Sequence, residues 1–331
     1  MNLFAKRSAK HSFINFSQDN TRALIGIENK LKIFKLENLS LEVEIETGPI
    51  FFANTLFSSS LLLYTTQENM KEIKFYSMNQ NKEITKLSFE KEIYNYQFNS
   101  QKLVILFKDE IVIYSINDLK KIGQITVDSD KNNKNRIIGL SNNERSLLAY
   151  PEKGKLILYD TNQMSDLVQL KCHNTPISSL IFNENETLIA TTSDNGKFLR
   201  VFEIPKEAVK QDPKSLKSET TPLIEFKRGS SVALVYNIHF SLNSKFILLT
   251  SERGTTHIFK MPDPNSKSNS VSTFVKVYSK KTQFHLVVFN LYRLNRIVIL
   301  DSNGLLFIHE FDEESGKSST LSQEVDLKEA K

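Results

Sequence analysis

The sequence has no tryptophan and only one cysteine, Cys172, among its 331 residues. A single cysteine excludes an internal disulfide and cannot supply a cysteine-rich zinc site. The N-terminus lacks the apolar stretch of a secretory signal. The longest apolar runs, such as 61–64, are far shorter than the roughly 20 residues that a membrane-crossing helix needs. We therefore expect a cytosolic chain that meets membranes only at their surface.

Enzymatic motifs are also missing. The chain has no GxxxxGK(S/T) phosphate loop, no GxGxxG, no HExxH and no GxSxG. Its six histidines fall in different parts of the chain without metal-ligand spacing, at His11, His173, His239, His257, His285 and His309. We expect no enzymatic activity, no cofactor and no metal site.

Charge is nearly balanced, because 43 basic residues face 38 acidic ones and leave a formal charge of +5. This excess is too mild for a typical nucleic-acid-binding protein, so we expect no nucleic-acid partner. Any electrostatic function must be confined to a local patch. We expect the chain to be a monomer.

A short apolar phrase, often closed by an aromatic residue, recurs seven times along the chain. Its copies are 31–34, 73–76, 111–114, 156–159, 199–202, 256–259 and 305–308. They are separated by roughly 40 to 57 residues, the spacing typical of propeller blades. Six of them follow a second strand-like phrase, at 60–65, 102–107, 146–150, 187–191, 245–250 and 296–300. Glycines occupy the connecting turn in four copies, at Gly154, Gly196, Gly254 and Gly304.

This pattern predicts an all-β fold, a seven-bladed β-propeller of a divergent WD-repeat type that lacks the usual Trp-Asp ending. We expect one domain over residues 1–311 and a disordered tail over 312–331, which is charged and rich in serine. The segments 206–221 and 262–273 stand outside the repeat and are rich in serine, lysine and proline, which is typical of mobile loops.

The segment from Cys172 to Phe259 carries a specific family resemblance. It contains the phrase 190–202 (ATTSDNGKFLRVF), then the tetrapeptide Phe226, Lys227, Arg228, Gly229, then the phrase 250–259 (TSERGTTHIF). In this order the three phrases resemble the PROPPINs, propellers that bind phosphatidylinositol 3-phosphate and phosphatidylinositol 3,5-bisphosphate through a Phe/Leu-Arg-Arg-Gly hallmark.

The tetrapeptide is predicted to divide two headgroup sites, because successive side chains of a strand point to opposite faces. A phosphomonoester carries close to two negative charges and calls for cations backed by hydroxyl and imidazole donors. The resemblance implies a first site of His173, Ser193, Lys197, Arg200 and Lys227. It implies a second site of Arg228, Ser251, Thr255 and His257. We expect Gly229 to let the backbone turn sharply after the charged pair.

The tetrapeptide departs from the family pattern at Lys227, where the relatives have arginine. Lysine is a point charge without the planar fork of arginine, so we expect the first site to be the weaker one. Lys197 replaces a usual threonine, and either compensates with its charge or faces solvent. Of the loop 262–274, only Val271 and Phe274 offer apolar side chains for contact with the membrane, which predicts shallow insertion.

The resemblance implies a phosphoinositide effector that acts in autophagy or endolysosomal traffic. Its partners would be phosphoinositide-containing membranes and proteins of the autophagy machinery. It would be a peripheral protein of autophagic, endosomal or vacuolar/lysosomal membranes. The alternative is a protein-interaction propeller, a scaffold whose lipid binding is weak or lost.

Overall fold

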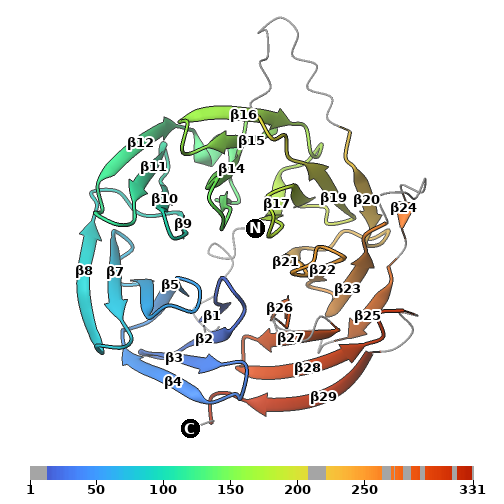
Figure 1. Cartoon of the computed structure of the whole chain (residues 1–331), viewed down its shortest axis with the longest axis horizontal. Helices are drawn as coiled ribbons and strands as arrows, with labels where there is room; N and C mark the ends of the chain where they lie inside the picture. Colours follow the sequence, from blue (N-terminus) through green and yellow to red (C-terminus); the bar gives the residue numbers. More distant parts are fainter. Residues whose placement is uncertain are drawn as a thin grey trace, which may run out of the picture. The chain divides into compact units, whose positions relative to one another are not determined.

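The computed structural model describes residues 13–207, 221–262, 270–271, 273–278, 285–290, 295–314 and 319–329. Within these ranges the chain is nearly all-β, and its only helix is the single turn α1 (Ser129–Asn132). The strands form seven sheets, six with four strands and one with five, and most neighbours in a sheet also follow one another along the chain (Figure 1). The expected fold class, a seven-bladed β-propeller, is confirmed.

The chain divides into two compact units. One unit comprises Leu3–Ile93 and Val277–Lys331, and contains three sheets. The first sheet is β1 (Phe13–Phe16), β2 (Arg22–Ile27), β3 (Lys30–Lys35) and β4 (Leu41–Glu46). The second is β5 (Ile50–Thr55), β6 (Leu61–Thr66), β7 (Glu72–Ser77) and β8 (Lys82–Ser88). The seventh is β26 (His285–Phe289), β27 (Arg296–Asp301), β28 (Leu305–Phe311) and β29 (Ser319–Asp326).

The other unit holds Tyr94–Lys276 and contains four sheets. The third sheet is β9 (Asn95–Phe98), β10 (Lys102–Leu106), β11 (Glu110–Ser115) and β12 (Lys121–Thr126). The fourth is β13 (Gly139–Leu140), β14 (Leu147–Glu152), β15 (Lys155–Asp160) and β16 (Ser165–Leu170). The fifth is β17 (Ile177–Phe182), β18 (Leu188–Ser193), β19 (Phe198–Glu203) and β20 (Ile224–Lys227), joined by β24 (Ser270–Val271). The sixth is β21 (Val235–Phe240), β22 (Phe246–Ser251), β23 (Thr255–Lys260) and β25 (Val275–Tyr278), whose last two residues fall in the first unit.

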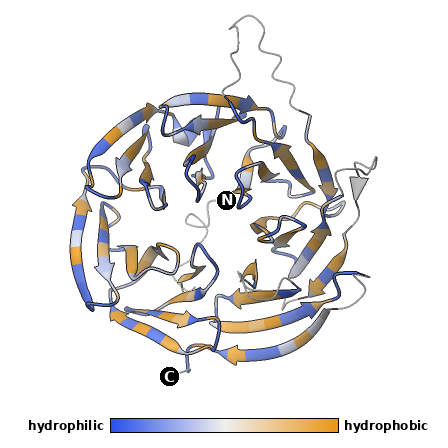
Figure 2. Cartoon of the chain, in the orientation of Figure 1, coloured by the Kyte–Doolittle hydropathy of each residue, from blue (hydrophilic) through white to orange (hydrophobic). Residues whose placement is uncertain are grey.

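The recurring apolar phrases are the third strands of the sheets, and the phrases before them are second strands. These strands are buried because both their faces pack against neighbouring sheets, as the burial of Leu31, Ile33 and Phe34 on β3 illustrates. Fourth strands were not predicted, because they alternate hydrophilic and hydrophobic residues (Figure 2) or, like β8, are almost wholly exposed. Each blade therefore has at least four strands, and the two recurring phrases are its second and third strands.

Turn glycines were predicted correctly. Gly154, Gly196, Gly254 and Gly304 all adopt positive φ angles, between 55° and 81°. The expected loops at 206–221 and 262–273 lie mostly outside the described residues.

The C-terminal segment differs from the disordered tail that its composition suggested. β29 pairs with β28 from Leu305↔Asp326 to Phe311↔Ser319 and completes the seventh sheet. Its side chains are mostly exposed, as an outer strand permits, while Leu327 just beyond it is fully buried. Backbone pairing and one buried leucine thus order a segment whose composition is that of a tail. No helix in the described part of the chain has the length and hydrophobicity of a membrane span.

Candidate anion-binding site

The tetrapeptide begins on β20, the outer strand of the fifth sheet. Phe226 is fully buried, and its ring stacks on that of Phe259 with centroids 4.8 Å apart. Lys227, the last residue of β20, is exposed and lies opposite Phe198 on β19. The side chains of Phe226 and Lys227 therefore point to opposite faces of the sheet, as the alternation of a strand requires. Lys227 makes no ion pair with any described residue, so its ammonium group is available to an anion.

Arg228 lies just beyond the strand and is only 7% exposed. Its backbone N–H donates to the oxygen of Lys197 at 2.8 Å, and its guanidinium donates to the main-chain oxygens of Gly196 and Ser231. Burial lowers the pKa of Arg228, and the nearby charge of Arg253 lowers it further. Arginine nevertheless keeps its charge. Arg228 is thus a buried cation that uses two of its five donors on the backbone.

Residues 228–234 form a segment, here called the strap, that joins two turns. Ala233 N–H donates to the oxygen of Asn195 in the β18–β19 turn at 3.2 Å. At the other end, Glu252 N–H in the β22–β23 turn donates to the oxygen of Leu234 at 2.9 Å. Arg253 Nη2 also donates to the oxygen of Val232 at 3.2 Å. The strap therefore holds the fifth and sixth blades together at the motif.

The two glycines near the strap, Gly196 and Gly229, differ in whether the backbone requires a glycine. A Cβ on Gly196 would lie 1.9 Å from the carbonyl oxygen of Ala233, and its φ of +55° is left-handed. Gly229 has no left-handed φ, and nothing lies within 4 Å of the place of its Cβ. The chain bends at Ser230 and Ser231, directly after Gly229, but neither the φ angle nor the surroundings of Gly229 require a glycine there. The steric need for glycine lies at Gly196.

On the blade-six side, Ser251 is fully buried and its Oγ has no hydrogen-bond partner among the described residues. Ser251 pairs across the turn with Thr255, which is half-buried. His257, two residues along β23, is buried and its Nδ1 lies 3.1 Å from Thr273 Oγ1. Burial, with smaller effects from Arg228 and Lys276, lowers the pKa of His257 to about 4. The guanidinium of Arg228 thus lies near the neutral imidazole of His257, and the unpaired hydroxyl of Ser251 lies on the strand paired with that of His257. Each of the three groups can donate a hydrogen bond to an anion.

On the blade-five side, the cation Arg200 is already paired. Its Nε lies 2.7 Å from Glu225 Oε2 on β20, and its Nη1 donates to the oxygen of Cys172 at 2.6 Å. His173 Nε2 lies 3.0 Å from Thr191 Oγ1, and burial, with the charge of Arg200, lowers the pKa of His173 to about 4. The carboxylate of Glu225 offsets the positive charge of Arg200, which the first site would need in order to bind a phosphate group.

The two remaining residues of the first site lie at the ends of the β18–β19 turn. Ser193 is buried and its main-chain oxygen accepts from Gly196 N–H at 2.7 Å. Lys197 is half-buried, and its oxygen accepts from Arg228. All residues predicted for the first site therefore belong to the fifth blade or, like His173, to the segment that leads into it from β16. Those of the second site belong to the sixth blade and the strap.

The expected membrane-contact residues have different surroundings. Phe274 is half-buried, its ring centroid lies 5.7 Å from that of Phe246, and Lys260 Nζ lies 5.5 Å from its centroid. Val271 lies on β24, which pairs parallel to β20 with Val271 opposite Phe226. The side chain of Val271 lies outside the described residues. Packing of Phe274 within its own blade leaves less of the ring for a membrane.

Sequence reasoning missed Glu225 and Arg253. Glu225 lies directly opposite Arg200 on the neighbouring strand, so the ion pair follows from register. Register between β19 and β20 was not readable, because residues 204–223 separate the two strands. Arg253 sits beside Gly254 in the predicted turn, and its position in that turn was the only available signal.

Comparisons with known proteins give the family of the chain. A family model described as PROPPIN matches residues 10–291. The chain is 26% identical to autophagy-related protein 18 of Phaeosphaeria nodorum over 79% of this chain and 66% of the relative. It is 25% identical to WD repeat domain phosphoinositide-interacting protein 2 of Xenopus laevis over 95% of this chain and 78% of the relative.

A solved structure, the complex of KlAtg21 with the coiled-coil of AgAtg16, is similar with a TM-score of 0.81 and 20% identity. The match covers 96% of this chain and 99% of that one, and it shows a shared propeller fold. The family model spans all the blades that carry the tetrapeptide and its two flanking phrases. The chain belongs to the PROPPIN family.

Proposed function

We propose that this protein binds phosphoinositide headgroups at a membrane surface and serves there as a scaffold for proteins of autophagy. The observation that carries the proposal is the buried cation Arg228, which lies near enough to His257 to lower its pKa, together with a buried Ser251 hydroxyl on the same sheet as His257 that has no partner among the described residues. A buried polar atom without a partner is costly, and a bound phosphate oxygen would satisfy it.

The two sites should differ in strength. Arg200 is neutralised by Glu225, whereas Arg228 has no carboxylate among its hydrogen-bond partners. A phosphomonoester gains more from a cation that no carboxylate already offsets. We therefore assign the blade-six site as the principal one and the blade-five site, with Lys227, as a secondary one. The names of some relatives refer to phosphoinositides as a class, and within that class phosphatidylinositol 3-phosphate and phosphatidylinositol 3,5-bisphosphate are the lipids that we propose.

Flotation of the purified protein with liposomes tests the proposal. The liposomes contain phosphatidylinositol, either proposed lipid, or an equal charge of phosphatidylserine. We expect flotation with the two phosphoinositides, a decline with added salt, and loss in a Lys227→Ala, Arg228→Ala double mutant. Flotation that phosphatidylserine supports equally well would mean that charge alone is recognised.

A second function is favoured by a specific observation. The guanidinium of Arg228 is committed to backbone oxygens and that of Arg200 to a carboxylate, as in a site that serves structure alone. In that case the protein is a protein-interaction scaffold with weak lipid binding. A folded protein that floats with none of the liposomes would favour this alternative.

A further inference from the structure

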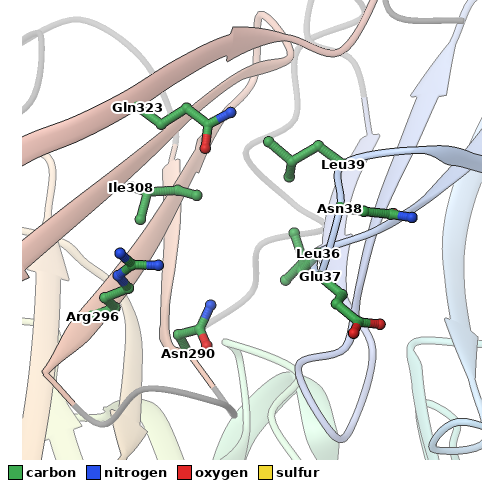
Figure 3. A pocket seen from close by; sticks show the side chains of 8 residues that line it. All are labelled: Leu36, Glu37, Asn38, Leu39, Asn290, Arg296, Ile308 and Gln323. Atoms are coloured by element: carbon green, nitrogen blue, oxygen red, sulfur yellow. The ribbon is translucent and has the colours of Figure 1, made fainter.

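The unit made of Leu3–Ile93 and Val277–Lys331 contains a pocket of about 470 Å³. It lies between the β3–β4 turn of the first sheet and the β27–β29 strands of the seventh (Figure 3). The candidate anion site lies wholly in the other unit. A pocket of this size is in the range of sites that hold small ligands or side chains of a peptide.

One part of the pocket is aliphatic. Leu36 and Leu39 from the β3–β4 turn point toward Ile308 on β28 (Figure 3). Leu36 and Ile308 also belong to the hydrophobic core of this unit, and Leu39 packs against that core. The aliphatic wall is therefore a rigid extension of the core, suited to an apolar side chain.

The rest of the pocket is polar. The amide of Gln323 on β29 projects into it beside Ile308, and Asn290 and Arg296 lie at its other end (Figure 3). Gln323 is exposed and makes no side-chain hydrogen bond with the described residues. An amide group both donates and accepts, which suits the main chain of an extended peptide.

The charges of the pocket favour a basic ligand. Arg296 is paired with Glu310 across β27 and β28, so its charge is offset. Glu37 is exposed at the rim and has no ion pair with the described residues. The lining thus carries one unpaired charge, a negative one.

We propose that this pocket binds a short extended segment of a partner protein, in which an apolar side chain is flanked by a lysine or arginine. The apolar side chain enters between Leu36, Leu39 and Ile308. The main chain of the segment bonds to the Gln323 amide, and the basic side chain pairs with Glu37. The proposal does not depend on lipid binding.

A random-peptide library displayed on phage and panned on the full chain tests this. Enriched peptides are then made synthetically and their Kd values are measured by fluorescence anisotropy. The variants are Glu37→Lys and Gln323→Ala, both at exposed positions. Glu90→Lys is the matched control, because Glu90 is an exposed glutamate of the same unit that does not line the pocket.

We expect enriched peptides that share an apolar residue next to a basic one. Glu37→Lys should weaken their binding about tenfold and Gln323→Ala about threefold, with no change in Glu90→Lys. All variants should float with liposomes like the parent protein. Three outcomes overturn the proposal: no enriched peptide, acid-flanked peptides, or binding that neither pocket variant alters. Self-association of the chain that Glu37→Lys abolishes in sedimentation would also overturn it, because a second copy would then be the occupant.

Discussion

The guanidinium of Arg228 donates from Nε to the main-chain oxygen of Gly196. The cation that we assign to the principal phosphate site therefore also fastens the strap to the β18–β19 turn. Binding and local stability depend on the same side chain, so their effects must be measured separately.

Arg228→Ala should lower the free energy of unfolding by about 1 to 3 kcal/mol, because it leaves buried carbonyl oxygens without donors. Lys227→Ala, at an exposed neighbour, should change it by less than about 0.5 kcal/mol. Urea unfolding measures both. In liposome flotation Arg228→Ala should also cost more binding than Lys227→Ala. Equal losses of binding would contradict the assignment of unequal sites.

Arg228→Lys separates the two roles. A lysine keeps the charge but cannot supply the planar fork that reaches two carbonyl oxygens. We expect the Arg228→Lys protein to have a free energy of unfolding between those of the parent and Arg228→Ala, and to keep part of the flotation with phosphoinositide liposomes. If the Arg228→Lys protein is as stable as the parent but does not float, the contribution of Arg228 to binding depends on guanidinium geometry and not on charge.

Gly196→Ala should strongly disturb the strap. The new Cβ would collide with the Ala233 carbonyl at a left-handed backbone position, at a cost of about 2 kcal/mol or more. Gly229→Ala is the matched control and should be tolerated within about 0.5 kcal/mol. Thermal unfolding and flotation of both variants check this. A destabilised Gly229→Ala protein would show that the tetrapeptide glycine has a conformational role after all.

Glu225→Gln should increase flotation with phosphoinositide liposomes several-fold at low salt. The change removes a carboxylate 2.7 Å from Arg200 and frees its charge for the blade-five site. Glu83→Gln is a suitable control, because Glu83 is a similarly exposed glutamate that pairs with Lys74 in the other unit. Unchanged flotation in Glu225→Gln would exclude Arg200 from headgroup binding.

Acidification should destabilise the folded protein. Burial lowers the pKa values of His239 and His257 to about 4, whereas unfolded histidine has a pKa of about 6.5. Between these values the unfolded chain binds more protons, so stability is complete above about pH 6.5 and declines toward about pH 4. Urea midpoints measured across this range check the sign. His257→Gln should flatten the decline, since glutamine does not titrate there.

How far the fold was predictable differs between strands. Third strands such as β11 were readable because they contain a continuous apolar block, here 111–114, which burial on both faces explains. The outer strand β8 was not readable, since six of its seven residues are exposed and nothing in its composition demands a sheet. Its place comes from backbone pairing with β7, which side chains do not encode.

The features of the candidate site also differ in how far the sequence could predict them. Strand alternation alone predicted different surroundings for Lys227 and Arg228, and the first is exposed while the second is buried. The neutralisation of Arg200 by Glu225 and the hydrogen bond from Arg228 to the carbonyl oxygen of Gly196 did not, because both depend on contacts between segments far apart in the sequence. Local periodicity predicts which way a side chain points, whereas its partners require the tertiary arrangement.

The strap has a consequence for any ligand that draws Arg228 away from its carbonyl partners. Such a ligand would weaken the attachment of the strap to the β18–β19 turn. The hydrogen bonds of the strap with Glu252 and Arg253, at its other end, would then also weaken or shift. Occupancy of one headgroup site would then alter the affinity of the other, so the protein would sense the density of lipid in a membrane and not only its presence. A flotation curve steeper than that of independent sites, lost in Arg253→Ala, is the signature of this coupling.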